Sequence, residues 1–290
     1  MNSTCLQKTT RILNKNVFKC FLNSHIRNQS SATNQSLILT DVNDKTGFAT
    51  VAFNRPPMSN FTLELLQDFS KSLDEVESKN YKGMILTSTS PTVFSAGLDL
   101  KELLNPEPAR LKALRTAYID CCIKLYSSMY PTVAAINGHA IGGGCFIAMA
   151  CEYRIMLPNS KIGLNETQLG IAIPEVAVHA TRNIISSRDA EMALTLGSVF
   201  TTDEALKIGL IDEVAENKED ALAKSEKFLS LFKKIPKRAR GITKQFFRKK
   251  VIDLMTNNRE KDVEAFVSYV MNPASQKSFQ AFLDEAKNKK

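Results

Sequence analysis

One acidic residue lies in a short apolar segment bounded by glycines, and it is the first candidate for chemistry. The segment is Gly163-Leu164-Asn165-Glu166-Thr167-Gln168-Leu169-Gly170. Glu166 is the only charged residue between Lys161 and Glu175. If its carboxyl group is buried, loss of hydration raises its pKa and makes it a better proton acceptor near neutral pH. The alternative interpretation is a surface glutamate or one that caps a helix.

Two other segments could present backbone amides to a negatively charged oxygen. The first is Phe94-Ser95-Ala96-Gly97-Leu98-Asp99-Leu100. Gly97 permits a tight backbone path that can leave the Ala96 amide without an internal partner, and such an amide can donate to an oxyanion. An ordinary turn is the alternative.

The second segment, residues 137–145, contains three successive glycines, Gly142, Gly143 and Gly144, before an apolar stretch. This arrangement lets a ligand approach backbone N–H groups at the start of a helix. The segment is not a P-loop, because no Gly-Lys-Ser/Thr follows, and it lacks the Gly-x-Gly-x-x-Gly spacing of dinucleotide-binding folds. Close packing of a helix on a strand is the alternative.

Together these three segments resemble the crotonase (enoyl-CoA hydratase/isomerase) superfamily over roughly residues 36–290. Residues 163–170 are most similar to its mitochondrial delta(3),delta(2)-enoyl-CoA isomerase branch. The resemblance implies a spiral of strand-strand-helix units with a helical C-terminal region that assembles homotrimers. It also implies Glu166 as the base and the amides of Ala96 and Gly143 as the oxyanion hole. The residues that it implies in contact with the acyl-CoA are Ala96, Gly97, Leu98, Asp99, Leu100, Gly143 and Asn165. No separate cofactor is expected, because coenzyme A is part of the substrate.

The number of acids selects the reaction within this family. A family hydratase adds water with two glutamates, and one of them falls at the position of Phe146 in this sequence. A phenyl ring can neither orient nor deprotonate water, so moving a double bond with Glu166 alone fits better than hydration. Glu175 lies near the position where related dienoyl-CoA isomerases place a second acid. We interpret it as the first residue of a helix after Pro174, where acids are favoured; if it faces the site, a longer double-bond transfer is possible.

Hydrophobic periodicity predicts an α/β fold. We expect strands at 37–42, 48–53, 83–87, 132–136 and 153–157, and helices near 63–76, 107–129 and 145–150. From Pro174 onward the pattern is almost entirely helical, with an N-cap signal at Thr201 or Thr202. We therefore divide the chain into a core with the active site, residues 36–196, and a helical C-terminal region, residues 197–290.

The first 35 residues have the composition of a mitochondrial presequence. Residues 1–40 carry five basic side chains and no acidic one, and on a helical wheel the basic and apolar residues fall on opposite sides. A matrix location is the corresponding prediction, and a disordered basic tail is the alternative. The rest of the chain holds 33 basic and 30 acidic residues, so the net charge of +8 is no argument for nucleic acid.

The remaining candidates are weaker. His139 and His179 have no nucleophilic partner in the sequence, and we expect structural roles for both. The six cysteines show no zinc-like spacing and are expected to be free thiols. Nine of the twenty residues at 231–250 are Lys or Arg. These residues could form a solvated helix face or contact coenzyme A phosphates. They also leave open a crotonase-like RNA-binding protein. No run of 18 apolar residues is present, so no membrane span is expected.

Overall fold

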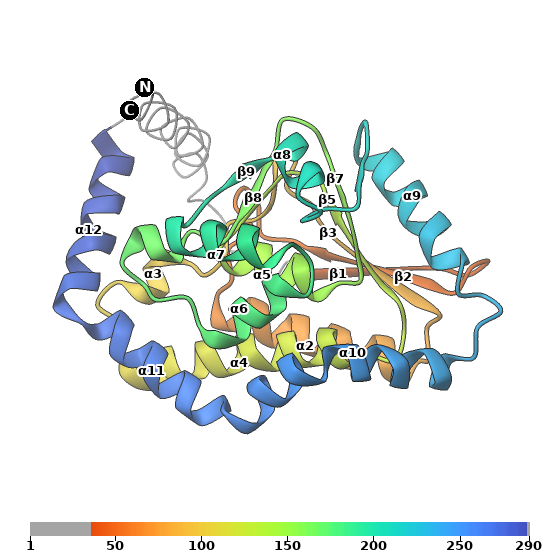
Figure 1. Cartoon of the computed structure of the whole chain (residues 1–290), viewed down its shortest axis with the longest axis horizontal. Coiled ribbons are helices and arrows are strands. Elements are labelled where there is room, and N and C mark those ends of the chain that lie inside the picture. The colour runs from red at the N-terminus through yellow and green to blue at the C-terminus, as the bar shows by residue number, and fades with distance from the viewer. Residues whose placement is uncertain (1–35, 289–290) are drawn as a thin grey trace.

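The computed structural model describes residues 36–288 and contains two β-sheets flanked by helices (Figure 1). The larger sheet has the order β1 (Ile38–Asn43), β2 (Phe48–Phe53), β3 (Gly83–Ser88), β5 (Thr132–Ile136), β7 (Tyr153–Met156) and β10 (Glu213–Val214). β1 and β2 form an antiparallel hairpin, and every later pair is parallel. β3 and β5 are buried along their whole length, as expected for parallel strands covered on both faces.

The smaller sheet has the order β4 (Val93–Ser95), β6 (His139–Ile141), β8 (Lys161–Gly163) and β9 (Phe200–Thr201). β4, β6 and β8 run parallel, and β9 is antiparallel to β8. The chain passes from β3 to β4, from β5 to β6 and from β7 to β8, each time from the larger sheet to the smaller. This is the predicted spiral of strand-strand-helix units. The sequence prediction missed the smaller sheet, because its strands have only two or three residues each.

The predicted helices are present with small shifts at their ends. The helices are α2 (Leu63–Ser78), α3 (Leu100–Leu103), α4 (Pro108–Ser127), α5 (Gly143–Ala150), the 3-10 turn η1 (Glu166–Leu169), α6 (Glu175–Arg182), α7 (Ser187–Leu196), α8 (Thr202–Lys207), α9 (Lys218–Ser230), α10 (Lys237–Asn257), α11 (Arg259–Met271) and α12 (Pro273–Asn288). α8 begins with a capping box in which Thr201 and Glu204 satisfy each other's backbone amides, which confirms the predicted N-cap.

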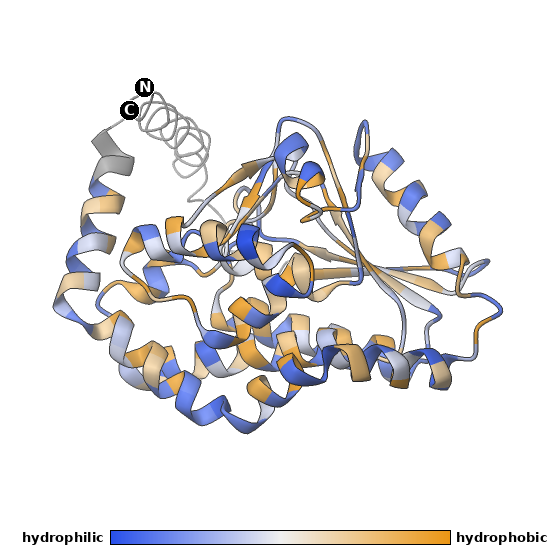
Figure 2. Cartoon of the chain, viewed as in Figure 1, coloured by the Kyte–Doolittle hydropathy of each residue, from blue (hydrophilic) through white to orange (hydrophobic). Residues whose placement is uncertain are grey.

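The core lies between the sheets and the helices α2 and α4. Phe53 of β2 is fully buried and makes edge-to-face contacts with Phe61, Phe69 and Phe94, at ring centroid distances of 5.0 to 5.6 Å. The opposite face of the larger sheet packs on α9 through Leu229 and Ala221. α9 and α10 alternate hydrophilic and hydrophobic residues along their length (Figure 2), as expected for helices with one buried side.

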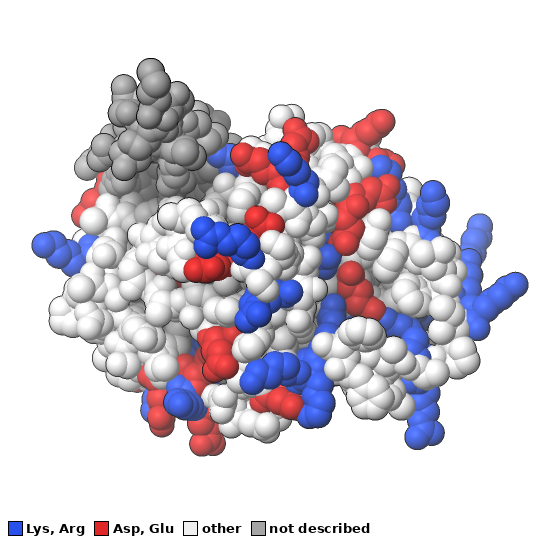
Figure 3. Space-filling view, viewed as in Figure 1, with Lys and Arg blue, Asp and Glu red and all other residues white. Residues whose placement is uncertain are grey.

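The basic segment 231–250 is only partly a solvated helix face. Arg240 and Lys244, one turn apart on α10, both form ion pairs with Glu152, and Lys244 Nζ lies 3.0 Å from Glu152 Oε2. Arg248, a further turn along, donates to the Ala150 carbonyl oxygen at 2.7 Å. These three side chains therefore attach α10 to the end of α5, while other basic residues gather on the surface where α9 and the start of α10 lie (Figure 3).

The remaining sequence predictions concern the presequence, the domain boundary, the cysteines, metal sites and membrane spans. The presequence at residues 1–35 lies outside the described residues, and the boundary at 196 stays a prediction. Cys121, Cys122, Cys145 and Cys151 are buried free thiols, as expected. Within residues 36–288, no group of His, Cys, Asp or Glu has the arrangement of a metal site, and no helix is long and apolar enough to cross a membrane.

We expect Phe53→Ala to lower the free energy of unfolding by about 3–5 kcal/mol, because it removes a buried ring that three other rings contact. Chemical denaturation measures this change. Phe247→Ala is the matched control, since the Phe247 side chain is 84% exposed, and it should change stability by less than about 0.5 kcal/mol. Similar losses for both variants would contradict this assignment of the core.

Candidate active site

The three candidate segments meet at one end of the smaller sheet. Residues 96–99 follow β4, Gly142 and Gly143 follow β6, and Asn165 and Glu166 follow β8. Because these strands are parallel, their carboxyl ends lie at the same edge. All the predicted site residues line a single cavity of about 740 Å³, whose walls are mainly apolar.

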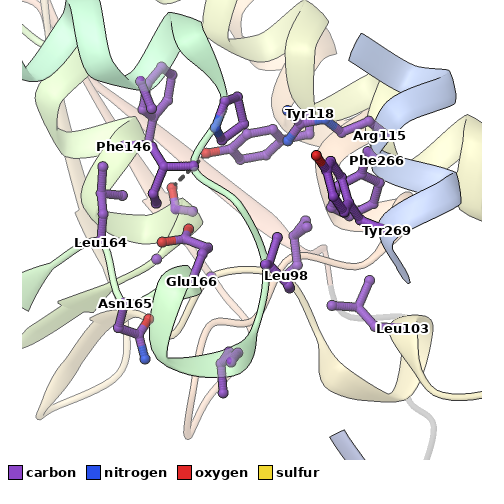
Figure 4. A pocket seen from close by; sticks show the side chains of 18 of the residues that line it. Leu98, Leu103, Arg115, Tyr118, Phe146, Leu164, Asn165, Glu166, Phe266 and Tyr269 are labelled. Carbon is purple, nitrogen blue, oxygen red and sulfur yellow. Dashed lines mark hydrogen bonds between the residues drawn. The ribbon is translucent and has the colours of Figure 1, made fainter. Parts of the chain in front are cut away.

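Glu166 points into this cavity (Figure 4). The residue as a whole is partly exposed, but its Oε2 atom is buried and has no hydrogen-bond partner among the described residues. Burial raises the pKa of the Glu166 carboxyl group to about 7, against smaller opposing effects of its own backbone amide and of Arg115. Of the two interpretations that the sequence left open, a buried carboxyl group and a surface or capping glutamate, the structure supports the first at the Oε2 atom. Near neutral pH the group can both accept and return a proton.

The amide prediction for the first loop is wrong at Ala96. The Ala96 amide donates to the Met58 carbonyl oxygen at 3.1 Å, so it has an internal partner. The Gly97 amide donates to Ser95 Oγ at 3.1 Å, and the Asp99 amide donates to the Phe61 carbonyl at 3.0 Å. The amide of Leu98 has no acceptor within residues 36–288. The sequence located the loop correctly, but the acceptors for the Ala96 and Asp99 amides are carbonyl oxygens of residues 58 and 61, which follow another strand.

The residue before Leu98, Gly97, packs against the backbone of Gly143. Gly143 is the first residue of α5, and its amide donates no hydrogen bond within the described part of the chain, as is usual in the first turn of a helix. Gly97 packs against it so closely that a Cβ placed at Gly97 would lie 2.9 Å from the Gly143 nitrogen. Gly97 also has a positive φ of 81°. The two free amides are therefore held together by a contact that only glycine permits.

Of the other residues predicted to contact the acyl-CoA, some line the cavity with apolar surface and Asp99 also stabilises the loop. Leu98 and Leu100 contribute partly buried apolar surface to the cavity. The Asp99 carboxylate caps α3 by accepting from the Lys101 amide at 3.0 Å and pairs with Arg55 at 2.8 Å. Asp99 thus fixes the loop as well as lining the cavity. Asn165 is buried, and its side-chain amide lies near Glu166 (Figure 4).

No second buried free carboxylate joins Glu166 in the described lining of the cavity. Phe146 is buried there, at the position of the hydratase acid. Glu175 begins α6, as predicted, and its side chain is 65% exposed at 3.4 Å from His179. His139 accepts a hydrogen bond from the Lys161 amide at 3.0 Å. Neither histidine lines the cavity, in agreement with structural roles.

Sequence reasoning missed two polar residues of α4 that line the cavity. Arg115 and Tyr118 of α4 line the cavity, and Tyr118 donates to the Gly143 carbonyl oxygen at 3.0 Å (Figure 4). Arg115 pairs with Asp262 of α11 at 2.6 Å. The sequence signal that could have identified Arg115 was a charged residue at a buried position of α4, in the same group as Leu111 and Leu114. No sequence signal pointed to its partner Asp262, which lies 147 residues further along the chain.

The fold and this cavity are those of a crotonase-type α/β protein. The sequence profile of the enoyl-CoA hydratase/isomerase family matches residues 43–289, and the chain belongs to that family. It is 39% identical over 256 residues to enoyl-CoA delta isomerase 1, mitochondrial, of Rattus norvegicus, covering 87% of this chain and 88% of that protein. The corresponding protein of Homo sapiens is 38% identical, with coverages of 87% and 84%.

Solved structures agree with this placement. The crystal structure of human mitochondrial delta3-delta2-enoyl-CoA isomerase superposes with a TM-score of 0.84 at 38% identity, covering 88% of this chain and all of that one. An enoyl-CoA hydratase from Bacillus halodurans has a TM-score of 0.77 at 25% identity, covering 85% of this chain and all of that one. The fold is therefore shared by isomerases and hydratases, and the distinction between them lies in the site.

We expect Gly97→Ala to destabilise the protein more than Gly170→Ala, by about 1–3 kcal/mol in chemical denaturation. Both glycines have a positive φ, so both variants introduce backbone strain. Only at Gly97 does the new methyl group meet backbone atoms, at 2.9 Å, whereas Gly170 has nothing within 4 Å. Equal losses would show that the two loops are not in tight contact.

We expect Glu166→Gln to change the pH dependence of stability. The native carboxyl keeps its proton up to a pKa of about 7, whereas the reference pKa is 4.5. Between these values the wild type loses stability as pH rises, because its unfolded chain has already released the proton. The unfolding free energy of the variant minus that of the wild type should therefore increase by about 2–3 kcal/mol from pH 4.5 to pH 7.5, allowing for partial exposure. A pH-independent difference would contradict the buried carboxylate.

Proposed function

We propose that this protein is a delta(3),delta(2)-enoyl-CoA isomerase, which converts 3-cis- or 3-trans-enoyl-CoA into 2-trans-enoyl-CoA. The observation that carries the proposal is one unpartnered, buried carboxylate oxygen in an apolar cavity that Leu98 and Gly143, the residues with free backbone amides, also line. The relatives named enoyl-CoA delta isomerase 1 support the same reaction. Breakdown of unsaturated fatty acids by β-oxidation is the process in which we place it.

The proposed reaction needs a single proton carrier. The Glu166 carboxylate removes a proton from C2 of the acyl group, and the electron pair moves onto the thioester oxygen to give a dienolate. The protonated Glu166 then returns the proton at C4, and the double bond finishes between C2 and C3. A pKa of about 7 suits this exchange, because neither the proton transfer to Glu166 nor the return is strongly uphill.

The proposed oxyanion hole consists of the Leu98 and Gly143 amides, rather than Ala96 and Gly143. Both donors are fixed by backbone contacts before the substrate arrives, so their dipoles need no rearrangement as charge develops. One such donor typically contributes about 3–4 kcal/mol to transition-state stabilisation. Tyr118 stabilises this arrangement, since its hydroxyl donates a hydrogen bond to the Gly143 carbonyl oxygen. Burial keeps the pKa of Tyr118 well above 10, so the hydroxyl retains its proton.

Hydration and dienoyl-CoA isomerisation are less well supported. Hydration needs a second acid or base to orient water, and Phe146 occupies the place of that acid. A dienoyl-CoA isomerase needs a second acid in the site, but Glu175 is mostly exposed and lies near His179. An RNA-binding role loses support because Arg240, Lys244 and Arg248 of the basic segment hold α10 on the core.

The surroundings of the reaction are part of the proposal. We place the protein in the mitochondrial matrix, on the composition of residues 1–35 and the mitochondrial names of its relatives. We propose a homotrimer, which the resemblance to the crotonase superfamily implies. We also propose that no cofactor is needed, because proton transfer by one carboxylate requires neither a metal nor a redox group.

We expect protein beginning at Ser36 to convert a 3-enoyl-CoA into the conjugated 2-enoyl product, and Glu166→Gln to lose at least about a hundredfold in kcat. Ultraviolet absorbance of the conjugated thioester measures the rate. Gln168→Glu is the matched control, since it places an acid two residues from the proposed base. In the Glu166→Gln background it should not restore activity, because Gln168 donates to the Leu196 and Gly197 carbonyls. A hydroxyacyl product would instead identify a hydratase.

A further inference from the structure

A buried arginine lies in the same cavity as the proposed base. Arg115 is only 7% exposed and lines the cavity from α4, one helical turn before Tyr118. The other cations on the described lining, Lys101 and Lys261, are exposed. A guanidinium stays protonated in proteins, so Arg115 brings a positive charge to this wall of the cavity, where the Asp262 carboxylate lies beside it.

The contacts of Arg115 leave part of the guanidinium available to the cavity. Its Nε and Nη2 both meet one oxygen of Asp262, at 2.7 and 2.6 Å. The group lies over the rings of Phe266 and Tyr118, at 4.8 and 5.6 Å from their centroids. Nη1 donates no hydrogen bond to the described residues. The two aromatic rings hold the charge in place, and Figure 4 shows it on the side of the cavity across from Glu166.

The remaining titratable groups around Glu166 provide no other buried positive charge. Tyr118 and Cys145 are neutral, because burial raises the pKa of each. Asp99 is paired with Arg55, and the Glu175 side chain is mostly exposed beside His179. The titratable groups that line the cavity besides Glu166 are Asp99 and Lys101 near α3, Arg115, Tyr118 and Cys122 of α4, Glu175 of α6, and Lys261, Asp262 and Tyr269 of α11.

We propose that the Arg115–Asp262 pair is a positioning element that sets the charge state of the base: Arg115 favours ionised Glu166 and the dienolate, and Asp262 limits that effect. The inference rests on the proposed function and adds a residue pair to it. Removal of Arg115 leaves the Asp262 anion alone, whereas removal of the Asp262 charge leaves Arg115 uncompensated. The two substitutions therefore act on Glu166 with opposite signs.

The electrostatics have the sign and size that the proposal requires. Arg115 lowers the pKa of Glu166, in opposition to the larger effect of burial. At an effective dielectric constant of about 20, Coulomb's law gives a pKa shift of about one unit for a charge about 12 Å away and about half a unit for one about 24 Å away. Such a shift decides what fraction of the base is ionised at neutral pH, because Glu166 titrates there.

The test is the pH dependence of kcat/KM for a 3-enoyl-CoA. Its acid limb reports ionisation of the base in the free enzyme. Arg115→Met should move the midpoint of that limb up by about half to one pH unit, and Asp262→Asn should move it down by a similar amount. Arg115→Lys, which keeps the charge, should restore the midpoint to within about 0.3 units of wild type.

Arg259→Met is the matched control. Arg259 also joins α11 to α4, through Asp120 at 2.6 Å, but it does not line the cavity. It should leave the midpoint unchanged, even if the rate falls at every pH. Midpoints that stay at the wild-type value in both Arg115→Met and Asp262→Asn, or that move in the same direction, would overturn the inference. Asp262→Asn decides the question alone if Arg115→Met does not fold.

This outcome is distinct from failure of the proposed function. If Glu166→Gln kept its activity, or if no 2-enoyl product formed, the assignment of the base would fall first. With that assignment intact, unchanged midpoints in the Arg115 and Asp262 variants would refute only the role of the pair.

Discussion

The site depends on keeping one carboxylate dry at an edge where three parallel strands end. Removing Glu166 Oε2 from water without giving it a donor costs free energy. That cost raises its pKa towards neutrality, which is what a reversible proton carrier requires. The apolar walls of the cavity, among them Leu98 and Phe146, therefore determine the basicity of the Glu166 carboxyl group.

The same edge determines where the amide donors lie. Loops at the ends of β4 and β6 approach each other so closely that a side chain at Gly97 would displace the Gly143 backbone. The strands are too short to be stable by themselves, and each continues from a strand of the larger sheet. The position of the amides is thus set by the register of two sheets. Local glycine content permits this geometry but does not determine it.

The sequence predicted which segments carry the site, and it failed where the answer depends on distant partners. Glu166 was a candidate as the only acid in an apolar segment, and the resemblance to the crotonase superfamily singled it out as the base. The choice of Ala96 over Leu98 was wrong, because the acceptor for the Ala96 amide is the Met58 carbonyl, supplied by another loop. Most of the larger sheet follows periodicity, whereas three-residue strands such as β4 carry too few residues for a pattern.

The C-terminal helices α10 and α11 contact the site and the end of α5 through side chains whose partners hydrophobic periodicity cannot predict. α11 supplies Asp262 and Phe266 to the cavity wall, and α10 precedes it directly. α10 is itself held by Glu152 and by the carbonyl at Ala150, both at the end of the helix that begins with Gly143. One short helix therefore presents a free amide at its first residue and anchors the cavity-forming helices near its last. Changes in the basic face of α10 should reach the site through α5 and α11, although no α10 cation touches Glu166.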